Sequence, residues 1–548
     1  MINWIKCTDL TKKILMAAIL FRFLATFTHF GWSHPDEWYE TAELGNLITN
    51  GQASFTEAIP LHYRNLTWPT MISGALKIAN LADPTSISIR IWSIRFLSFL
   101  MDILFLIGIA GILKKRFQTI WSLNLSFFFM ALFWGGINES VRPSQEHLAL
   151  ALTAFSIHLN INKSSFFSGL TAALIGVAKY SVGFMSLGLV IGFAFENKKS
   201  IHKILLGSFL GIFIGGVTDW IFYGRFYESL WMYAQYNLIT DLGKTGYGIQ
   251  SATEYLNYFR GQLRGPLIII APIIFLLAPL GWIREFRNKQ YWILGPPIFL
   301  ASQLLSAHKE PRFMIPIFPF LLYLTLVEIS ERKQIWTTLK PLSLIVATLA
   351  IATNIALVLG STWGEFLKKN WTYLEIDSHL AAHPSTCAVI SINRPMSLQL
   401  SPKIHAYYPY KDRDPLNLPK IRSSDIPLIW VNQSGKDCDQ ILVHSNKIDS
   451  SWTDNGCTLL SSGLYGILPV AWPFENNTYI RKTTSGPWYH CDGKILNEFT
   501  HQQTRNLIYS GTFQKIEPLP GWNSTSVELK SIMKKQSRGQ EGGVVVDW

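Results

Sequence analysis

Charged residues are scarce in this chain. Asp, Glu, Lys and Arg make up 15% of its 548 residues, while hydrophobic residues make up 49% and aromatic residues 14%. This scarcity excludes an ordinary soluble enzyme and indicates a polytopic membrane protein. The formal net charge of +12 does not indicate nucleic acid binding, because the Lys and Arg residues form short clusters between apolar runs, as residues that flank membrane spans do.

Motifs for common cofactors are also missing. There is no P-loop and no G-x-G-x-x-G after a strand, so nothing indicates ATP or dinucleotide use. No pair of cysteines has the C-x-x-C spacing of a zinc site. Asp412-Arg413-Asp414 has the pattern that holds a divalent cation against a nucleotide sugar, but it precedes Pro415 in a polar turn, where aspartates are usually only solvated. We therefore expect no metal and no cofactor.

Apolar runs long enough to cross a bilayer recur through the first two thirds of the chain. One run, at 165–196, is interrupted at Lys179 and Tyr180, and we interpret it as two spans that meet at this break. The other runs lie at about 14–32, 93–113, 118–134, 145–161, 201–222, 263–282, 290–306, 313–330 and 341–361. The sequence thus predicts about eleven spans. The first is expected to be retained, because no small-residue cleavage site follows it.

Cationic clusters fall in every second loop, as the positive-inside rule requires. They contain Lys12, Lys115, Lys163, Lys199, Arg287 and Arg332, and we assign their side to the cytoplasm. The opposite side then receives the segment around Asp36, the break at Lys179, the aromatic-rich loop 223–262 and the segment 308–312. The residues with catalytic chemistry are therefore predicted to face away from the cytoplasm.

Two domains are predicted, a membrane domain at 1–361 and a soluble α/β domain at 362–548 on the non-cytoplasmic side. In the second, apolar runs shorten to strand length, at Cys387–Ile392, Ile426–Val431 and Leu464–Val470. Four cysteines lie in this domain, on a side where disulfides can persist. They allow three pairings, among which the sequence does not choose: Cys387, Cys438, Cys457 and Cys491.

Two shorter helices are predicted in the loop of roughly sixty residues between the first two spans, which is far longer than a common connection. Apolar faces at 38–48 and 71–79 predict helices that lie flat in the membrane interface. Elsewhere, Gly207, Gly211 and Gly215 recur at every fourth position of one span. This spacing predicts close packing of two helices rather than chemistry.

The stretch from Ser33 to Glu37, which includes His34 and Asp36, follows the first span directly. Charge at that depth is costly enough to suggest a functional site, and a carboxylate there can act as a general base. The structural alternative is a capping box, with Ser33 as N-cap and Asp36 at N3 of an interfacial helix. Both interpretations can hold, because a helix N-terminus keeps a first-turn carboxylate ionised.

A second charged stretch runs from His308 to Phe313 and contains Lys309, Glu310 and Arg312. Cations that only anchor a span would be expected on the cytoplasmic side with the other clusters. These lie on the opposite side, which favours a substrate site. They suit a lipid-linked phosphate, which accepts charge-assisted hydrogen bonds and gains charge as a leaving group.

Together the two stretches resemble the family 22 glycosyltransferases of the GT-C superfamily, which include the GPI mannosyltransferases and the lumenal mannosyltransferases of N-glycan assembly. The segment from Arg64 to Pro69 is similar to the family's segment before its second interfacial helix. The segment from Asp219 to Gly224 is similar to its Asp…Tyr-Gly at a span end. The resemblance covers about residues 14–330.

The resemblance implies a membrane enzyme that transfers mannose, with inversion and without a metal, from a polyprenyl- or dolichyl-phosphate donor to a lipid-linked glycan acceptor. Asp36 would be the base on the acceptor hydroxyl and Glu37 would orient it. His308, Lys309 and Arg312 would bind the donor phosphate. Possible further substrate contacts are His34, Arg64, Lys179, Asp219 and Tyr223. The chain departs from the family pattern at Glu40, where many members have Gln, and at Pro311, which replaces a commoner aromatic residue.

A transporter or flippase of a lipid-linked sugar would share the many spans and the outer cations. Transporters more often show internal repeats and helices broken at the midplane. The chain shows no repeat and its charges lie at span ends, which favours the enzyme. If Asp36 is not the base, the next candidates are Glu139, Glu146 and Asp219. The acceptor, and the choice between an endoplasmic reticulum membrane and a bacterial inner membrane, stay open.

Overall fold

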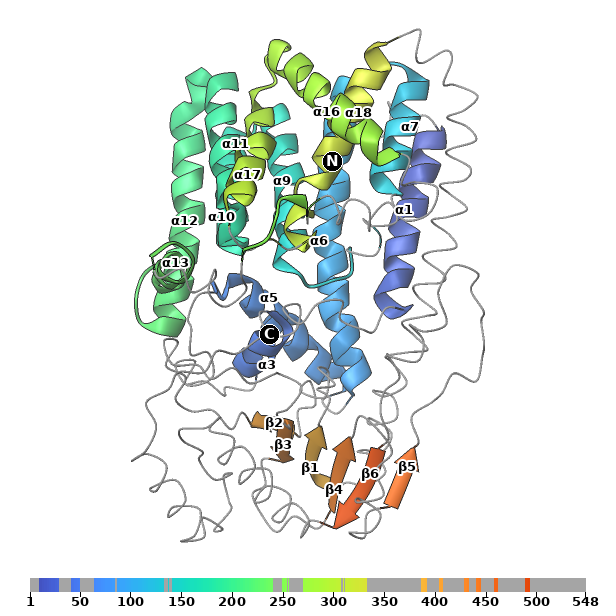
Figure 1. The fold of residues 1–548 in the computed structure, drawn as a ribbon, viewed down its shortest axis with the longest axis vertical. Helices are drawn as coiled ribbons and strands as arrows, with labels where there is room; N and C mark the ends of the chain where they lie inside the picture. The colour runs from blue at the N-terminus through green and yellow to red at the C-terminus, as the bar shows by residue number, and fades with distance from the viewer. Residues whose placement is uncertain are drawn as a thin grey trace.

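The computed structural model describes residues 9–28, 41–49, 64–83, 86–132, 137, 140–239, 249–253, 255, 270–306, 309 and 311–332, and six strands between residues 386 and 492. The described part is a bundle of helices with a small sheet beyond one end (Figure 1).

Each predicted span up to residue 330 coincides with a described helix. These helices are α1 (Asp9–Thr28), α6 (Ile87–Arg116), α7 (Ile120–Ala131), α9 (Gln145–Ile161), α10 (Ser165–Ala178), α11 (Gly183–Glu196), α12 (Ile201–Tyr223), α16 (Ile270–Arg287), α17 (Gly295–Leu305) and α18 (Phe318–Glu331). Within the described ranges, Ile89–Arg116 and Lys198–Tyr223 are long and apolar enough to cross a membrane by length and composition. The predicted span 341–361 lies outside the described residues, so the total number of spans stays a prediction.

The predicted interruption of the long run at 165–196 is present. α10 ends at Ala178, a short 3-10 turn, η3 (Tyr180–Val182), follows, and α11 begins at Gly183. Lys179 has an extended backbone, with φ −150° and ψ 112°, which ends the first helix. The break therefore places Lys179 and Tyr180 at a junction of two helices.

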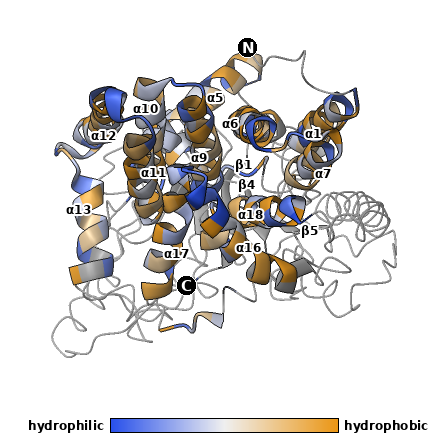
Figure 2. Ribbon diagram, turned by 90° about the horizontal axis from the view of Figure 1, so that it is seen from above, coloured by the Kyte–Doolittle hydropathy of each residue, from blue (hydrophilic) through white to orange (hydrophobic). Residues whose placement is uncertain are grey.

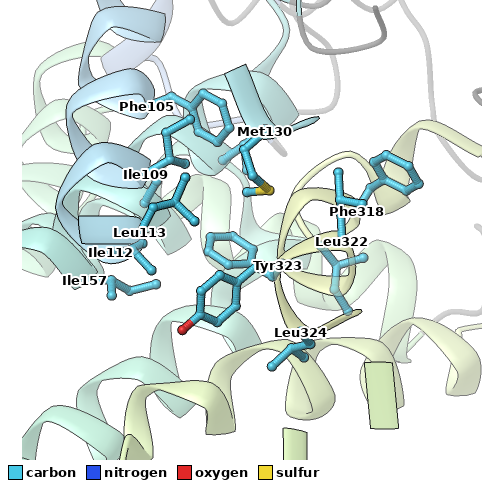
Figure 3. Packing of buried hydrophobic residues seen from close by; sticks show 14 of the residues in the cluster. Phe105, Ile109, Ile112, Leu113, Met130, Ile157, Phe318, Leu322, Tyr323 and Leu324 are labelled. Atoms are coloured by element: carbon cyan, nitrogen blue, oxygen red, sulfur yellow. The ribbon is translucent and has the colours of Figure 1, made fainter. Parts of the chain in front are cut away.

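The interior of the bundle is apolar. Figure 3 shows side chains from α6, α7, α9 and α18 pointing toward one another, among them Phe105, Ile109, Leu113, Met130, Ile157, Phe318 and Tyr323. Figure 2 shows that the helices are hydrophobic along much of their length, and many of their large apolar side chains are exposed on the outside of the bundle. On α12 these exposed side chains include Leu205, Leu206, Phe209 and Ile212. Apolar residues on both faces are what a helix in a lipid bilayer requires.

The cations assigned to the cytoplasm gather at one end of the bundle. Arg116, which ends α6, pairs with Glu285 of α16 at 2.7 Å and with Glu331 of α18 at 2.8 Å. Lys163 Nζ donates to Asn197 Oδ1 at 2.9 Å and joins two further loops of the cationic side. These contacts agree with the alternation of loops predicted from the sequence. The membrane side that this end faces stays a prediction.

Two shorter helices lie at the opposite end of the bundle, α3 (Glu43–Thr49) and α5 (Thr67–Ala82) (Figure 1). They coincide with the two helices predicted in the first long loop. On the predicted apolar face of α5, Ile72, Leu76 and Ala79 are buried in the protein and Met71 is 40% exposed. Trp68, before this face, is buried as well. That the two helices lie flat in the membrane interface stays a prediction.

α12 packs against α10 through the predicted glycine stripe. A Cβ added at Gly207 would lie 2.0 Å from the carbonyl oxygen of Phe166. One added at Gly211 would lie 2.8 Å from Cβ of Ala173. Only glycine permits this approach of the two backbones, so the predicted packing role is confirmed.

We expect Gly207→Ala to lower the free energy of unfolding by about 1–3 kcal/mol, because the added methyl group meets helix backbone that cannot turn away. Gly74→Ala in α5 is the matched control, since nothing lies within 4 Å of a Cβ built there. In that helix alanine is favoured over glycine by ~1 kcal/mol. Thermal unfolding of the purified protein in detergent measures both variants, and equal melting temperatures would contradict the close contact.

The C-terminal strands form one six-stranded sheet in the order β2-β3-β1-β4-β6-β5, beyond α3 and α5 (Figure 1). They are β1 (Thr386–Ser391), β2 (Ile404–Tyr407), β3 (Leu428–Asn432), β4 (Gln440–His444), β5 (Thr458–Ser461) and β6 (Trp488–Asp492). β1 and β4 are parallel and the other neighbours are antiparallel. Two predicted strands coincide with β1 and β3, and the third, 464–470, lies outside the described residues. The predicted helices of this domain and its boundary at residue 361 stay predictions.

Candidate active site

The structure describes six of the ten predicted site residues and leaves four outside the described ranges. His34, Asp36, Glu37 and His308 lie outside the described residues, as do Glu40 and Glu139. The other six are described: Arg64, Lys179, Asp219, Tyr223, Lys309 and Arg312. Apart from Lys309, which bonds to Ser306 and Gln250, they belong to two groups of contacts at the end of the bundle that carries α3 and α5.

The first group surrounds Phe313. The Nζ of Lys179 lies 3.1 Å from Oε1 of Glu146, and both side chains are 4% exposed. The same Nζ lies 6.0 Å from the centre of the Phe313 ring. The guanidinium carbon of Arg312 lies 5.3 Å from that ring centre. We call Glu146, Lys179, Arg312 and Phe313 the cation cluster.

Each polar member of the cation cluster comes from a helix end. Glu146 is in the first turn of α9, whose N-cap Ser144 accepts a hydrogen bond from the backbone N–H of His147 at 3.1 Å. Lys179 comes from the extended break before η3. Arg312 lies in a short 3-10 turn, η8 (Pro311–Met314), just before α18. Local signals for ending helices thus bring these charges together at one end of the bundle.

The cation cluster contains charges of both signs. Lys179 and Arg312 are two cations, and Glu146 is one carboxylate. Lys309, three residues before Arg312, is 6% exposed, and its ammonium group donates to the carbonyl oxygen of Ser306. Two cations beside a half-buried aromatic ring suit an anion such as a phosphate, which accepts charge-assisted hydrogen bonds.

The second group surrounds Asp219, which is fully buried near the end of α12. Its Oδ1 accepts a hydrogen bond from Asn65 Nδ2 at 2.9 Å. Its Oδ2 accepts from the backbone N–H of Ser229 at 3.0 Å and from the Ser229 hydroxyl at 2.6 Å. Ser229 belongs to α13 (Glu228–Ala234). Because protein groups occupy both oxygens, this arrangement favours a structural role over base or substrate contact.

Tyr223 and Tyr180 extend this group in two directions. The Tyr223 hydroxyl donates to the carbonyl oxygen of Arg64 at 2.9 Å. The Tyr180 hydroxyl hydrogen-bonds with the Ser229 hydroxyl. The segments Arg64–Pro69 and Asp219–Gly224, which resemble family motifs far apart in the sequence, therefore touch each other. Tyr180 follows Lys179 directly, so the two groups of contacts are neighbours in the chain.

Residues 13–391 match the family model described as the Alg9-like mannosyltransferase family. The chain belongs to the Alg9-like mannosyltransferase family. The resemblance to family 22 glycosyltransferases predicted from the sequence is confirmed, and the chain is an integral membrane protein.

Individual members of the Alg9-like family match parts of the chain. The alpha-1,2-mannosyltransferase alg9 of Schizosaccharomyces pombe is 28% identical over 169 residues, which cover 26% of this chain and 29% of that protein. The GPI alpha-1,2-mannosyltransferase 3 of Bos taurus is 21% identical over 328 residues, 58% of this chain and 59% of that protein. The alpha-1,2-mannosyltransferase ALG9 of Saccharomyces cerevisiae is 25% identical over 389 residues, 64% and 66%. The chain thus spans from under a third to about two thirds of the length of these relatives.

A solved structure also matches this Alg9-like chain. It is the crystal structure of ArnT from Cupriavidus metallidurans bound to undecaprenyl phosphate. The match has a TM-score of 0.44 and 11% sequence identity, and it covers 71% of this chain and 76% of that chain.

One charged group in this Alg9-like chain was missed by reasoning from the sequence. Arg22 of α1 and Asp102 of α6 form a fully buried ion pair, and Nε2 of His147 in α9 lies 3.0 Å from the same carboxylate. The signal was available, because Arg22 and Asp102 stand inside apolar runs, where ionisable residues are rare and have partners. The group joins three helices of the bundle next to Glu146.

Metal binding was also considered for the described part of the chain. No group of three or more His, Cys, Asp and Glu side chains there could hold a metal ion. Transfer without a metal stays a prediction, because several predicted site residues lie outside the described ranges.

Proposed function

We propose that this chain is a membrane glycosyltransferase, and specifically a mannosyltransferase, that uses a polyprenyl- or dolichyl-phosphate-linked mannose and glycosylates a lipid-linked glycan acceptor with inversion. Membership of the Alg9-like family supports the reaction. The alpha-1,2-mannosyltransferase names of the relatives support the sugar. The observation that carries the proposal is the cation cluster, in which Arg312 and Lys179 flank an aromatic ring at a helix junction.

The transfer would be a single displacement at the anomeric carbon of mannose. The acceptor hydroxyl oxygen forms a bond to this carbon while the bond from the carbon to the phosphate oxygen breaks. The phosphate leaves with the electron pair, and the acceptor's proton passes to the carboxylate of Asp36. His308, Lys309 and Arg312 stabilise the charge on the departing phosphate, and Glu37 orients the base.

The wider arrangement follows from the same proposal. The membrane domain, residues 1–361, has about eleven spans, and the domain 362–548 lies on the non-cytoplasmic side together with the site. The sheet lies beyond α3 and α5, at the end of the bundle opposite Arg116, which supports this placement. The membrane is that of the endoplasmic reticulum or a bacterial inner membrane.

The deciding experiment supplies polyprenyl-phosphate-linked labelled mannose to the purified protein in detergent, with lipids extracted from the native membrane as acceptors. Label should appear in a new lipid-linked glycan. A transporter or flippase would give no product, because detergent leaves no barrier to cross. Absence of label with every lipid fraction would reject the proposed reaction.

Arg312→Ala and Lys309→Ala should each raise the KM for donor by about ten- to hundredfold, the value of a hydrogen bond to a charged group. Phosphate contacts belong to the donor, so the KM for acceptor should change little. Arg225→Ala is the matched control, because this arginine lies at the same end of the bundle with 79% of its side chain exposed. Steady-state rates at varied donor and varied acceptor measure both constants. A change confined to acceptor dependence would remove these residues from the donor site.

A further inference from the structure

α3 and α5 form one packed unit. A Cβ at Gly45 would lie 2.5 Å from Cγ2 of Ile72, so the two helices are in close contact. The Thr49 hydroxyl donates to the Ser73 hydroxyl at 3.0 Å. Residues 41–49 and 64–82 are therefore called the α3–α5 unit.

Among the described segments, the α3–α5 unit is the nearest to Asp36 along the sequence. Thr41, its first residue, is buried and follows Asp36 by five positions in the sequence. A fully extended chain of that length reaches at most about 18 Å. The place of the proposed base therefore depends on where this unit sits against the bundle.

The unit contacts the bundle through two sets of residues. Ile72 and Leu76 pack against Ile91 and Ile94 of α6, and Asn46 Oδ1 accepts a hydrogen bond from the Arg90 guanidinium. A second set comes from the segment Arg64–Trp68. Trp68 Nε1 donates to the carbonyl oxygen of Pro143 at 2.9 Å. The Thr67 hydroxyl lies 3.1 Å from the Thr218 hydroxyl. The innermost contact is Asn65, whose amide donates both to Asp219 and, at 3.0 Å, to the carbonyl oxygen of Gly215.

The contact between Asn65 and Asp219 needs a carboxylate. All three hydrogen bonds that Asp219 accepts come from neutral donors: the Asn65 amide, the Ser229 backbone N–H and the Ser229 hydroxyl. A buried carboxylate is costly unless such donors satisfy it. If residue 219 were an asparagine, its NH2 group would face one of these donors. At least one of the three hydrogen bonds would then be lost.

We propose that Asp219 is a positioning residue, which through Asn65 holds the α3–α5 unit on the corner between α12 and α13 and so constrains the chain that leads, five positions before Thr41, to Asp36. The inference rests on the proposed function, because it gives Asp36 the role of the base. Asp219 touches no donor contact described above, so its loss should misplace the base without weakening the donor site. A misplacement of about 1 Å can reduce a rate by ~100-fold.

The test is an exchange of the two side chains. Asp219→Asn removes an acceptor, and Asn65→Asp opposes two carboxylates 2.9 Å apart in the present arrangement. In the double variant the amide introduced at position 219 can donate to the carboxylate introduced at position 65. Its own carbonyl oxygen still accepts from Ser229. The exchange therefore restores the pairing, although the carbonyl of Gly215 loses its donor.

Each single variant should lower kcat by at least about tenfold and leave the KM for donor within about twofold of the unchanged protein. The double variant should have a kcat at least about threefold above that of the better single variant, as expected for coupled neighbours. Glu228→Gln is the control, because this carboxylate lies next to Ser229 in sequence and its ion pair within the described residues, at 4.0 Å, is with the exposed Arg225. Its kcat should match that of the unchanged protein.

Multiplicative effects of the two single changes, or a rise in the KM for donor without a fall in kcat, would overturn the inference. If a single variant does not fold, Ser229→Ala removes the hydroxyl's hydrogen bonds to Asp219 and to Tyr180 and keeps the bond from its backbone N–H to Asp219. It should then lower kcat in the same direction by a smaller factor, and an unchanged kcat would equally overturn the inference.

The two proposals fail in different ways. If the protein without substitutions transfers no mannose, the proposed function is rejected. Thermal unfolding of the exchange variants then still tests the docking, because the double variant should melt above both single variants. If the protein without substitutions transfers mannose and the double variant recovers no kcat, only the role of Asp219 is rejected.

Discussion

Asp36→Asn should lower single-turnover mannose transfer by at least about a hundredfold, because general-base assistance contributes about a hundred- to ten-thousandfold. The amide cannot take the proton of the acceptor hydroxyl. Asparagine has nearly the same size and keeps some of the capping ability expected of an N3 residue, so the protein should fold and insert normally. Glu37→Gln should cost less, since an amide keeps part of an orienting role.

The measurement is a single turnover of purified protein at saturating donor, with the melting temperature recorded for each variant. The matched control is Asp83→Asn, a change of the same kind in the C-cap residue of α5. Near-normal transfer by Asp36→Asn would return this residue to a capping role. A loss of transfer only in step with a lower melting temperature would do the same. Glu146 would then be the next candidate for the base.

The helices of the membrane domain could be predicted because each is encoded by its own run of apolar residues. The break at Lys179 and the glycine stripe on α12 are likewise local patterns, and both are present. The apolar face of α5 was also predicted, but not which of its residues pack against the protein. Met71 is exposed because the direction of a helix face is set by the partner it packs against, here through Trp68.

The contacts of the candidate site could not be predicted in the same way. Asn65 and Asp219 are 154 residues apart in the sequence, and no local pattern reports that they share a hydrogen bond. The resemblance to family motifs marked both segments but gave neither a partner. The sequence held one usable signal for two ion pairs, that of Lys179 with Glu146 and the buried one of Arg22 with Asp102. A charge inside an apolar run requires a counter-charge.

Lys179→Met should lower the free energy of unfolding by about 3–5 kcal/mol, the cost of removing one partner from a buried ion pair. The ammonium group lies 3.1 Å from Oε1 of Glu146, and both side chains are 4% exposed. Methionine keeps the length and volume of the lysine stem, so the loss reports the charge rather than a cavity. Melting temperatures in detergent, with Lys199→Met at the opposite end of the bundle as control, measure the effect.

The double variant Lys179→Met with Glu146→Gln separates stability from donor binding. Removing both charges should restore most of the stability, because a buried pair contributes little net stability relative to neutral residues that pack equally well. Donor binding should stay impaired, since Lys179 supplies one of the two cations beside Phe313. We expect the KM for donor to rise about tenfold in the double variant, within the range for the loss of a hydrogen bond to a charged group. If stability and donor use recover together, the ion pair only holds α9 to the α10–α11 break, and the anion site reduces to the 308–312 segment.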